Sequence, residues 1–276
     1  MTFKHFEPSD YSLVIDFLVK LNKENPNHIN WNWARFERMY FHPEFDKSLI
    51  NSIGLWLDNG DIVAIATFDM YFGESACLCL EEYEYLYEEV VNYAKENMNE
   101  NGEFALTIED NNAYELETIK KLGYTKIEQD ETLLCASLEN IHISRLNNDF
   151  SFVELDQIKD NIELQWLFYQ GFDHGDDKEE FNKQLDLNFI PRPHCNKYLS
   201  VGIRNAEGKL ISFCGCWYLE GTDYAYIEPA CTIPAYRNKG IGTEVLLEVL
   251  RRAKTLGAKK AYVISDNNFY KKCAFC

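Results

Sequence analysis

An internal repeat constrains the fold of this chain more than any other feature. The segments 52–72 and 198–219 both have the pattern of a strand, a turn and a second strand, and each follows a region with apolar residues at helical spacings of three and four. After each hairpin the pattern continues with a third strand, a long helix, a fourth strand and a short helix. The sequence therefore predicts two copies of one α/β unit, joined near residues 137–149.

The repeated elements occupy matching positions in the two halves. Helices before the hairpins are expected at 10–25 and 32–41, and at 156–172 and 177–189. The third strand, long helix, fourth strand and short helix are expected at 74–80, 81–98, 103–108 and 111–124, and again at 223–233, 240–257, 259–265 and 267–275. We therefore expect two domains, residues 1–143 and residues 144–276.

The charge of the chain excludes some classes of partner. Asp and Glu number 45 against 27 Lys and Arg, which gives a formal net charge of -18. Such a field repels nucleic acid and anionic membranes and favours a cationic partner. No run approaches the roughly 18 apolar residues of a membrane span, and the first residues carry acids where a secretory signal is apolar. We expect a cytoplasmic protein that binds neither nucleic acid nor membrane.

The nine cysteines do not form a recognisable metal motif. Cys77 and Cys79, like Cys214 and Cys216, lie in apolar strand-like segments where a period of two places both thiols on one face. We interpret them as small buried hydrophobic residues. The Cys-x-x-Cys at 273–276 has no second pair at zinc-finger spacing, so no metal is expected.

A glycine-bearing corner, PAYRNKGIG at residues 234–242, stands between a predicted strand and a predicted helix. A helix start leaves backbone N–H groups without internal partners and carries the positive end of the helix dipole, so it favours a diphosphate. Gly240 and Gly242 remove side chains that would collide with phosphates or strain the turn. The candidate donors are the amides of Asn238, Lys239, Gly240, Ile241, Gly242 and Thr243.

Basic side chains accompany this corner in an otherwise acidic chain. Arg237 and Lys239 add positive charge beside the predicted amides. The alternative is that the glycines only turn the chain and the cations are solvated. Neither a G-x-x-x-x-G-K-[ST] loop nor the third glycine of a dinucleotide-binding G-x-G-x-x-G is present.

The corner resembles the acetyl-CoA signature of the GNAT superfamily of N-acetyltransferases, which is Arg or Gln, two residues, Gly, any residue, and Gly or Ala. Pro234 and Tyr236 stand where the family often has proline and tyrosine, and the segment 267–275 resembles its closing segment. The tandem arrangement resembles mycothiol synthase and related two-copy acetyltransferases. This resemblance implies an α/β (α+β) fold of two tandem GNAT-like domains, each a mixed, mostly antiparallel twisted sheet flanked by helices.

The resemblance also implies an activity and a set of site residues. The family reaction is direct attack of an amine on the thioester of acetyl-CoA, an acyltransferase reaction of the EC 2.3.1 type. Tyr270 then corresponds to the tyrosine that protonates the departing thiolate, and Asn267 opens the same segment. Backbone N–H groups around Cys231, Thr232 and Ile233, where the family strand often bulges, would polarise the thioester carbonyl.

Two further residues are candidates for the base that deprotonates the amine. Glu228 lies on the strand that leads into the corner, and His174 lies between the two helices where the family builds its acceptor site. The alternative interpretations are an exposed strand residue for Glu228, a solvated loop residue for His174 and a structural core residue for Tyr270. A core thiol is likewise the simpler interpretation of Cys231.

The first half lacks the corner. Glu81, Glu82 and Glu84 occupy the corresponding helix start and would repel a diphosphate, so we expect this copy to be catalytically silent. The second half stops at Cys276, where the family normally adds two strands. We expect truncation, or an edge covered by the first domain or by a second molecule, so a homodimer is one expected state.

Two functions remain open on the sequence. The first is an N-acetyltransferase for a small-molecule amine or a peptide amino group, expected to be cationic. The second is a non-catalytic protein that binds or senses CoA or acyl-CoA. The identity of the acceptor does not follow from the fold.

Overall fold

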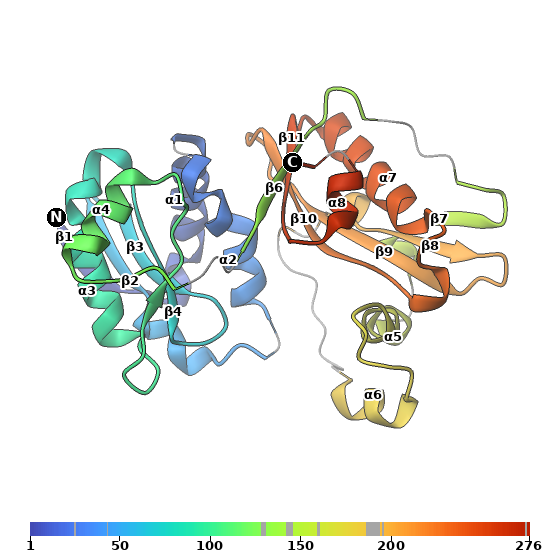
Figure 1. Ribbon diagram of the computed structural model, residues 1–276, viewed down its shortest axis with the longest axis horizontal. Helices are drawn as coiled ribbons and strands as arrows, with labels where there is room; N and C mark the ends of the chain where they lie inside the picture. The colour runs from blue at the N-terminus through green and yellow to red at the C-terminus, as the bar shows by residue number, and fades with distance from the viewer. Residues whose placement is uncertain are drawn as a thin grey trace. The chain divides into compact units, whose positions relative to one another are not determined.

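The computed structural model describes residues 1–24, 26–42, 44–127, 131–141, 146–158, 161–185, 194, 196–273 and 275–276 (Figure 1). The chain divides into two compact units, Met1–Asp130 and Glu131–Cys276. The predicted domain boundary between residues 143 and 144 lies outside the described residues. No helix in these described ranges is both long and apolar enough to cross a membrane.

The first unit follows the predicted order of elements. These are β1 (Thr2–His5), α1 (Tyr11–Glu24), α2 (Trp33–Tyr40), β2 (Gly54–Asp58), β3 (Asp61–Phe68), β4 (Glu74–Cys79), α3 (Tyr87–Asn97), β5 (Ala105–Leu106) and α4 (Ala113–Lys121). The sheet order is β1-β2-β3-β4-β5, and only β4 and β5 pair in parallel.

The second unit repeats this order after one additional strand. Its elements are β6 (Leu133–Ser137), β7 (Phe150–Glu154), α5 (Asn161–Gly171), α6 (Lys178–Gln184), β8 (Val201–Asn205), β9 (Leu210–Trp217), β10 (Tyr224–Thr232), α7 (Ile241–Leu256), β11 (Lys260–Ile264) and α8 (Asn268–Lys272). The sheet order is β6-β11-β10-β9-β8-β7, with β10 and β11 parallel. The predicted fold of two mixed, mostly antiparallel sheets flanked by helices is confirmed. Residues 186–189 of the predicted helix 177–189 lie outside the described residues.

The first copy leaves its third strand differently from the prediction. The long helix was expected to start at Glu81, but residues Glu81–Leu86 form a 3-10 turn and α3 begins at Tyr87. No side chain caps either start, and the acids of the 3-10 turn stand where the second copy has its glycine corner. The two units therefore differ at the start of this helix.

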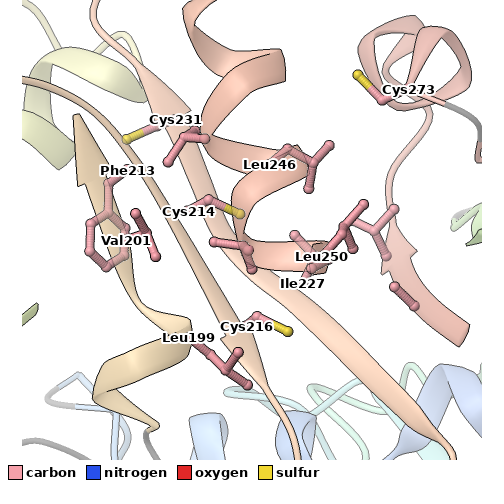
Figure 2. Close-up of a cluster of buried hydrophobic side chains, with 14 of the residues drawn as sticks. Leu199, Val201, Phe213, Cys214, Cys216, Ile227, Cys231, Leu246, Leu250 and Cys273 are labelled. Carbon is pink, nitrogen blue, oxygen red and sulfur yellow. The ribbon is translucent and has the colours of Figure 1, made fainter. Parts of the chain in front are cut away.

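The sheet of the second unit carries helices on both of its faces (Figure 1), and buried side chains pack on each face. Phe168 of α5 packs on Phe213 of β9, with ring centroids 5.5 Å apart. The next residue of β9, Cys214, points to the opposite face, where it lies with Leu246 and Leu250 of α7 (Figure 2). This alternation follows from the period of two along a strand. The sheet is therefore covered by α5 on one face and by α7 on the other.

The two Cys-x-Cys pairs are buried, as predicted for small hydrophobic residues. Burial raises the pKa of the Cys214 and Cys216 thiols above the usual range. Cys273 is also buried, whereas Cys276 is exposed.

The edge of the second sheet beyond β11 is covered by β6. The strand pairs antiparallel with β11, for example Cys135 with Tyr262. On its other side the Cys135 backbone exchanges two hydrogen bonds with Cys276, of 2.8 and 2.9 Å. The segment that forms β6 lies within the predicted first domain, residues 1–143, but in the structure it belongs to the second compact unit. The pairing satisfies backbone groups that an open edge would leave exposed.

Candidate functional site

The corner predicted from the sequence connects β10 to α7. After β10 the chain forms a single 3-10 turn, Pro234–Tyr236, and Gly240 is the N-cap of α7. Gly240 has a φ of 80°, in the left-handed region that L side chains rarely adopt. No atom lies within 4 Å of the position that a Cβ would take there, so the backbone conformation alone requires glycine.

The amides at this corner are available to a ligand. The first hydrogen bond of α7 joins the Glu244 N–H to the Gly240 carbonyl at 3.0 Å. Among the described residues, the N–H groups from Asn238 to Thr243 have no protein acceptor. Residues 238–240 are exposed, and Gly242 and Thr243 are half-buried. This arrangement is the one that binds phosphate at helix N-termini.

Gly242 is required for a different reason from Gly240. A Cβ at Gly242 would lie 3.1 Å from Thr232 Oγ1 and 3.4 Å from the ring of Phe269. The first turn of α7 therefore packs tightly between the end of β10 and α8. Close packing against protein fixes this glycine.

The two cations of the corner have protein partners. Lys239 Nζ donates to the Ala235 carbonyl at 2.9 Å and lies 5.1 Å from the centroid of the Tyr236 ring. Arg237 donates to the carboxylate of Asp173 and to backbone carbonyls. The predicted contribution of their charges to phosphate binding stays a prediction, and the partners of Arg237 were not predicted.

The predicted bulge of the strand occurs earlier than expected. We expected it around Cys231 to Ile233, but the register of β10 on β9 shifts between Ile227 and Ala230. Pro229 lies within this shift and has no N–H to donate to the ladder, which explains the position. Pairing of β10 with β11 covers only Tyr224–Tyr226 in the part of the chain that the structure describes.

The hydrogen-bond pattern separates the three backbone amides that were expected to polarise the thioester carbonyl. The Ile233 N–H donates to the Ile211 carbonyl at 3.1 Å, so it is already used by β9. Because donors alternate along an antiparallel strand, the Cys231 N–H also faces β9 and the Thr232 N–H faces away from it. In agreement, the Cys231 carbonyl accepts from Ser212 Oγ, while the Thr232 carbonyl accepts from Arg237 Nε. Of the three amides, only the Thr232 N–H is directed away from β9, so the expected interaction with the thioester carbonyl is limited to this amide.

Tyr270 lies in α8 with its side chain 9% exposed. Burial raises the pKa of its phenol above the usual range, and the nearby Glu228 carboxylate raises it further. The hydroxyl is protonated near neutral pH, as an ordinary phenol already is. Asn267 is the N-cap of this helix, and its side chain accepts from the Phe269 N–H at 2.9 Å.

The other candidates differ in their surroundings. Glu228 is half-buried at the bulge, and its carboxylate raises the pKa of Tyr270. His174 is exposed between α5 and α6, with its ring 5.6 Å from the ring of Tyr169. Burial raises the pKa of Cys231 to about 12, so its thiol is protonated, in keeping with a core residue.

The contact of Gly171 with the end of β10 was not predicted from the sequence. A Cβ at Gly171, the last residue of α5, would lie 2.7 Å from Cys231 Sγ and 3.8 Å from the Thr232 backbone nitrogen. The end of α5 therefore lies directly against the end of β10. The glycine at the end of a predicted helix is the only sequence signal for this contact, and it does not name the partner.

Comparison with known proteins agrees with this geometry. The sequence profile described as the acetyltransferase (GNAT) family matches residues 158–275. No curated protein sequence matches the chain.

Solved structures resemble the chain over its length. A GCN5-related N-acetyltransferase from Sphaerobacter thermophilus has a TM-score of 0.59 at 11% identity, covering 100% of this chain and 91% of that one. A GNAT-family acetyltransferase from Colwellia psychrerythraea has a TM-score of 0.58 at 15% identity, covering 100% and 96%. A tandem GNAT protein from the clavulanic acid biosynthesis pathway has a TM-score of 0.54 at 10% identity, covering 99% and 94%. At these identities the likeness shows the fold alone, and the profile match shows that residues 158–275 are similar to the GNAT acetyltransferase family.

Proposed function

We propose that the second unit is an acetyl-CoA-dependent N-acetyltransferase. The observation that carries the proposal is the run of amides from Asn238 to Thr243, which have no protein acceptor in the described chain. Of these residues only Ile241 is buried, and all of them lie in the segment that matches the GNAT family profile. When bound, acetyl-CoA would supply the acetyl thioester that an amine attacks directly.

The start of α7 fits a diphosphate. Backbone N–H groups and the positive end of the helix dipole favour an anion there, and each charge-assisted hydrogen bond contributes about 1.5–3 kcal/mol. The open space beside Gly240 leaves room for the approach of a phosphate. The net charge of -18 opposes binding at long range, but salt screens it beyond about 8 Å.

Three groups have proposed roles in the chemistry. The Thr232 N–H, directed away from β9, donates to the carbonyl oxygen on which negative charge develops. Tyr270 donates its phenolic proton to the departing sulfur, because a phenol carries this proton near neutral pH and α8 packs against the first turn of α7. Glu228 accepts a proton from the amine, which in water is free base only about once in a thousand molecules at neutral pH. His174 is the alternative base.

The acceptor is proposed to be a cationic amine. The chain carries an excess of acids, and the loop between α5 and α6 adds Asp176, which is exposed. Asp177 has a structural role instead, because it caps α6 by accepting from the Glu179 and Glu180 amides. The first unit is proposed to be silent, because acids and a 3-10 turn replace the glycine corner.

Two measurements on the same sample test this proposal. Titration calorimetry with CoA should show one site per chain, and thiol release from acetyl-CoA should appear with at least one member of a panel of polyamines, aminoglycosides, amino-acid derivatives and peptides. Failure to bind CoA in a folded sample would reject both functions. Binding without turnover on any amine would support the second candidate, a CoA sensor.

A further inference from the structure

Arg237 is held by four hydrogen bonds that do not involve the amides of the corner. Nε donates to the Thr232 carbonyl, one terminal nitrogen donates to both carboxylate oxygens of Asp173, and the other donates to the Gly171 carbonyl, each at 2.9 Å. Two partners lie at the end of α5, and the third lies at the end of β10. The guanidinium therefore bridges the end of α5 and the end of β10, and Arg237 lies 66 residues from Gly171 in sequence.

The bridge completes the end of α5. A helix leaves its last carbonyls without internal partners, and a cation placed there also compensates the negative end of the helix dipole. Asp173 has a φ of 62°, so the chain turns sharply directly after the helix. Arg237 satisfies the last carbonyl and holds the carboxylate of the turn at once.

The bridged position adjoins the proposed reaction centre. Gly171 approaches Cys231 and the Thr232 backbone nitrogen, which is the amide proposed to polarise the thioester carbonyl. The loop that starts there carries His174 and leads into α6. A displacement of this loop would move the proposed acceptor side relative to Thr232.

We propose that Arg237 is a positioning residue that fixes the loop at residues 172–175 against the end of β10, and that it is not a ligand of the cofactor phosphates. The expected effect of Arg237 on catalysis rests on the function proposed above. The hydrogen bonds that join Arg237 to α5 and β10 do not depend on that function. Arg237 belongs to the sequence pattern that suggests phosphate binding, yet its Nε and both terminal nitrogens donate to protein groups.

The two roles predict opposite effects for one substitution. If Arg237 bridges, Asp173→Asn and Arg237→Ala both loosen the loop. If Arg237 binds phosphate, Asp173→Asn releases the guanidinium toward the anion and strengthens CoA binding, while Arg237→Ala weakens it. Asparagine tolerates the left-handed conformation of residue 173, so the substitution removes charge without adding strain.

Hydrogen exchange measured by mass spectrometry reads the loop directly. The amides of Phe172, Asp173 and His174 are reporters because each donates to a carbonyl of α5. Asp173→Asn should raise their exchange rates about two- to fivefold, as expected for an exposed ion pair, and Arg237→Ala should raise them more because it also removes two carbonyl contacts. Lys239→Ala is the matched control, since it removes one positive charge from the same corner but its ammonium contacts Ala235. That variant should leave the three rates unchanged.

Calorimetry with CoA and steady-state kinetics complete the test. Both bridge variants should change the Kd for CoA by less than about threefold and raise the KM for the amine more, with partial recovery in Arg237→Lys. Unchanged exchange in both bridge variants, or tighter CoA binding in Asp173→Asn with weaker binding in Arg237→Ala, would overturn the proposal. If the wild-type protein binds no CoA, the proposed function fails, and the exchange rates still decide whether the bridge exists.

Discussion

Gly240→Ala separates the backbone requirement of the corner from its role in binding. At a φ of 80° an L side chain costs about 1–2 kcal/mol, and no neighbouring atom adds a clash. If φ of residue 240 becomes negative to relieve this strain, the N–H groups of residues 240 and 241 rotate away from the proposed diphosphate site. Loss of one charge-assisted bond then weakens CoA binding by about ten- to a hundredfold.

Gly208→Ala is the matched control. Gly208 also has a φ of 80° with no atom within 4 Å of the Cβ position, and it lies in the turn between β8 and β9 of the same unit. Urea unfolding should show a similar loss of stability in both variants, about 1–2 kcal/mol. Calorimetry should show weaker CoA binding only in Gly240→Ala. Equal CoA affinity in the two variants would refute the assignment of the diphosphate to this corner.

Two other predictions concern single side chains in the two units. Tyr270→Phe should lower kcat about ten- to a hundredfold with less than a threefold change in the Kd for CoA, and an unchanged kcat would remove the phenol from the mechanism. In the first unit, burial raises the pKa of Glu115 to about 8 and lowers the pKa of His28 to about 4. Between about pH 4.5 and 6.5 the folded state binds one proton more than the unfolded state at Glu115 and one fewer at His28. The two effects on the free energy of unfolding therefore cancel in this range. From about pH 6.5 to 8 only Glu115 contributes, and the folded state binds more protons than the unfolded state, so stability should fall by about 2 kcal/mol as the pH rises. Glu115→Gln should abolish this decline in urea unfolding at pH 6.5 and 8, and a decline that persists would contradict the assignment.

The order of elements could be predicted because it depends on local periodicity. The apolar run of β9, which is buried along its whole length, and the spacings of three and four on α7 follow from the surfaces that these elements bury. The repeat supplies each assignment twice. The glycine corner was found for a similar reason, because a left-handed residue before a helix has few alternatives to Gly240.

The rest depends on contacts between distant segments. The bond from Arg237 to Asp173 and the approach of Gly171 to Cys231 join α5 to β10, and no residue pattern specifies such a partner. The predicted position of the bulge was wrong because Pro229, which has no N–H to donate, interrupts the ladder earlier in the strand. The pairing of β6 with β11 was not predicted, since strand partners across more than a hundred residues cannot be chosen from local sequence.

The most direct test of the account is the response of individual backbone amides to CoA. Amide-resolved NMR of the full chain, titrated with CoA, should shift the signals of residues 238–243 at the start of α7 and leave those of Glu81–Leu86, the corresponding turn of the first unit, unchanged. Saturable CoA binding that leaves the signals of residues 238–243 in place would contradict the claim that these amides hold the diphosphate.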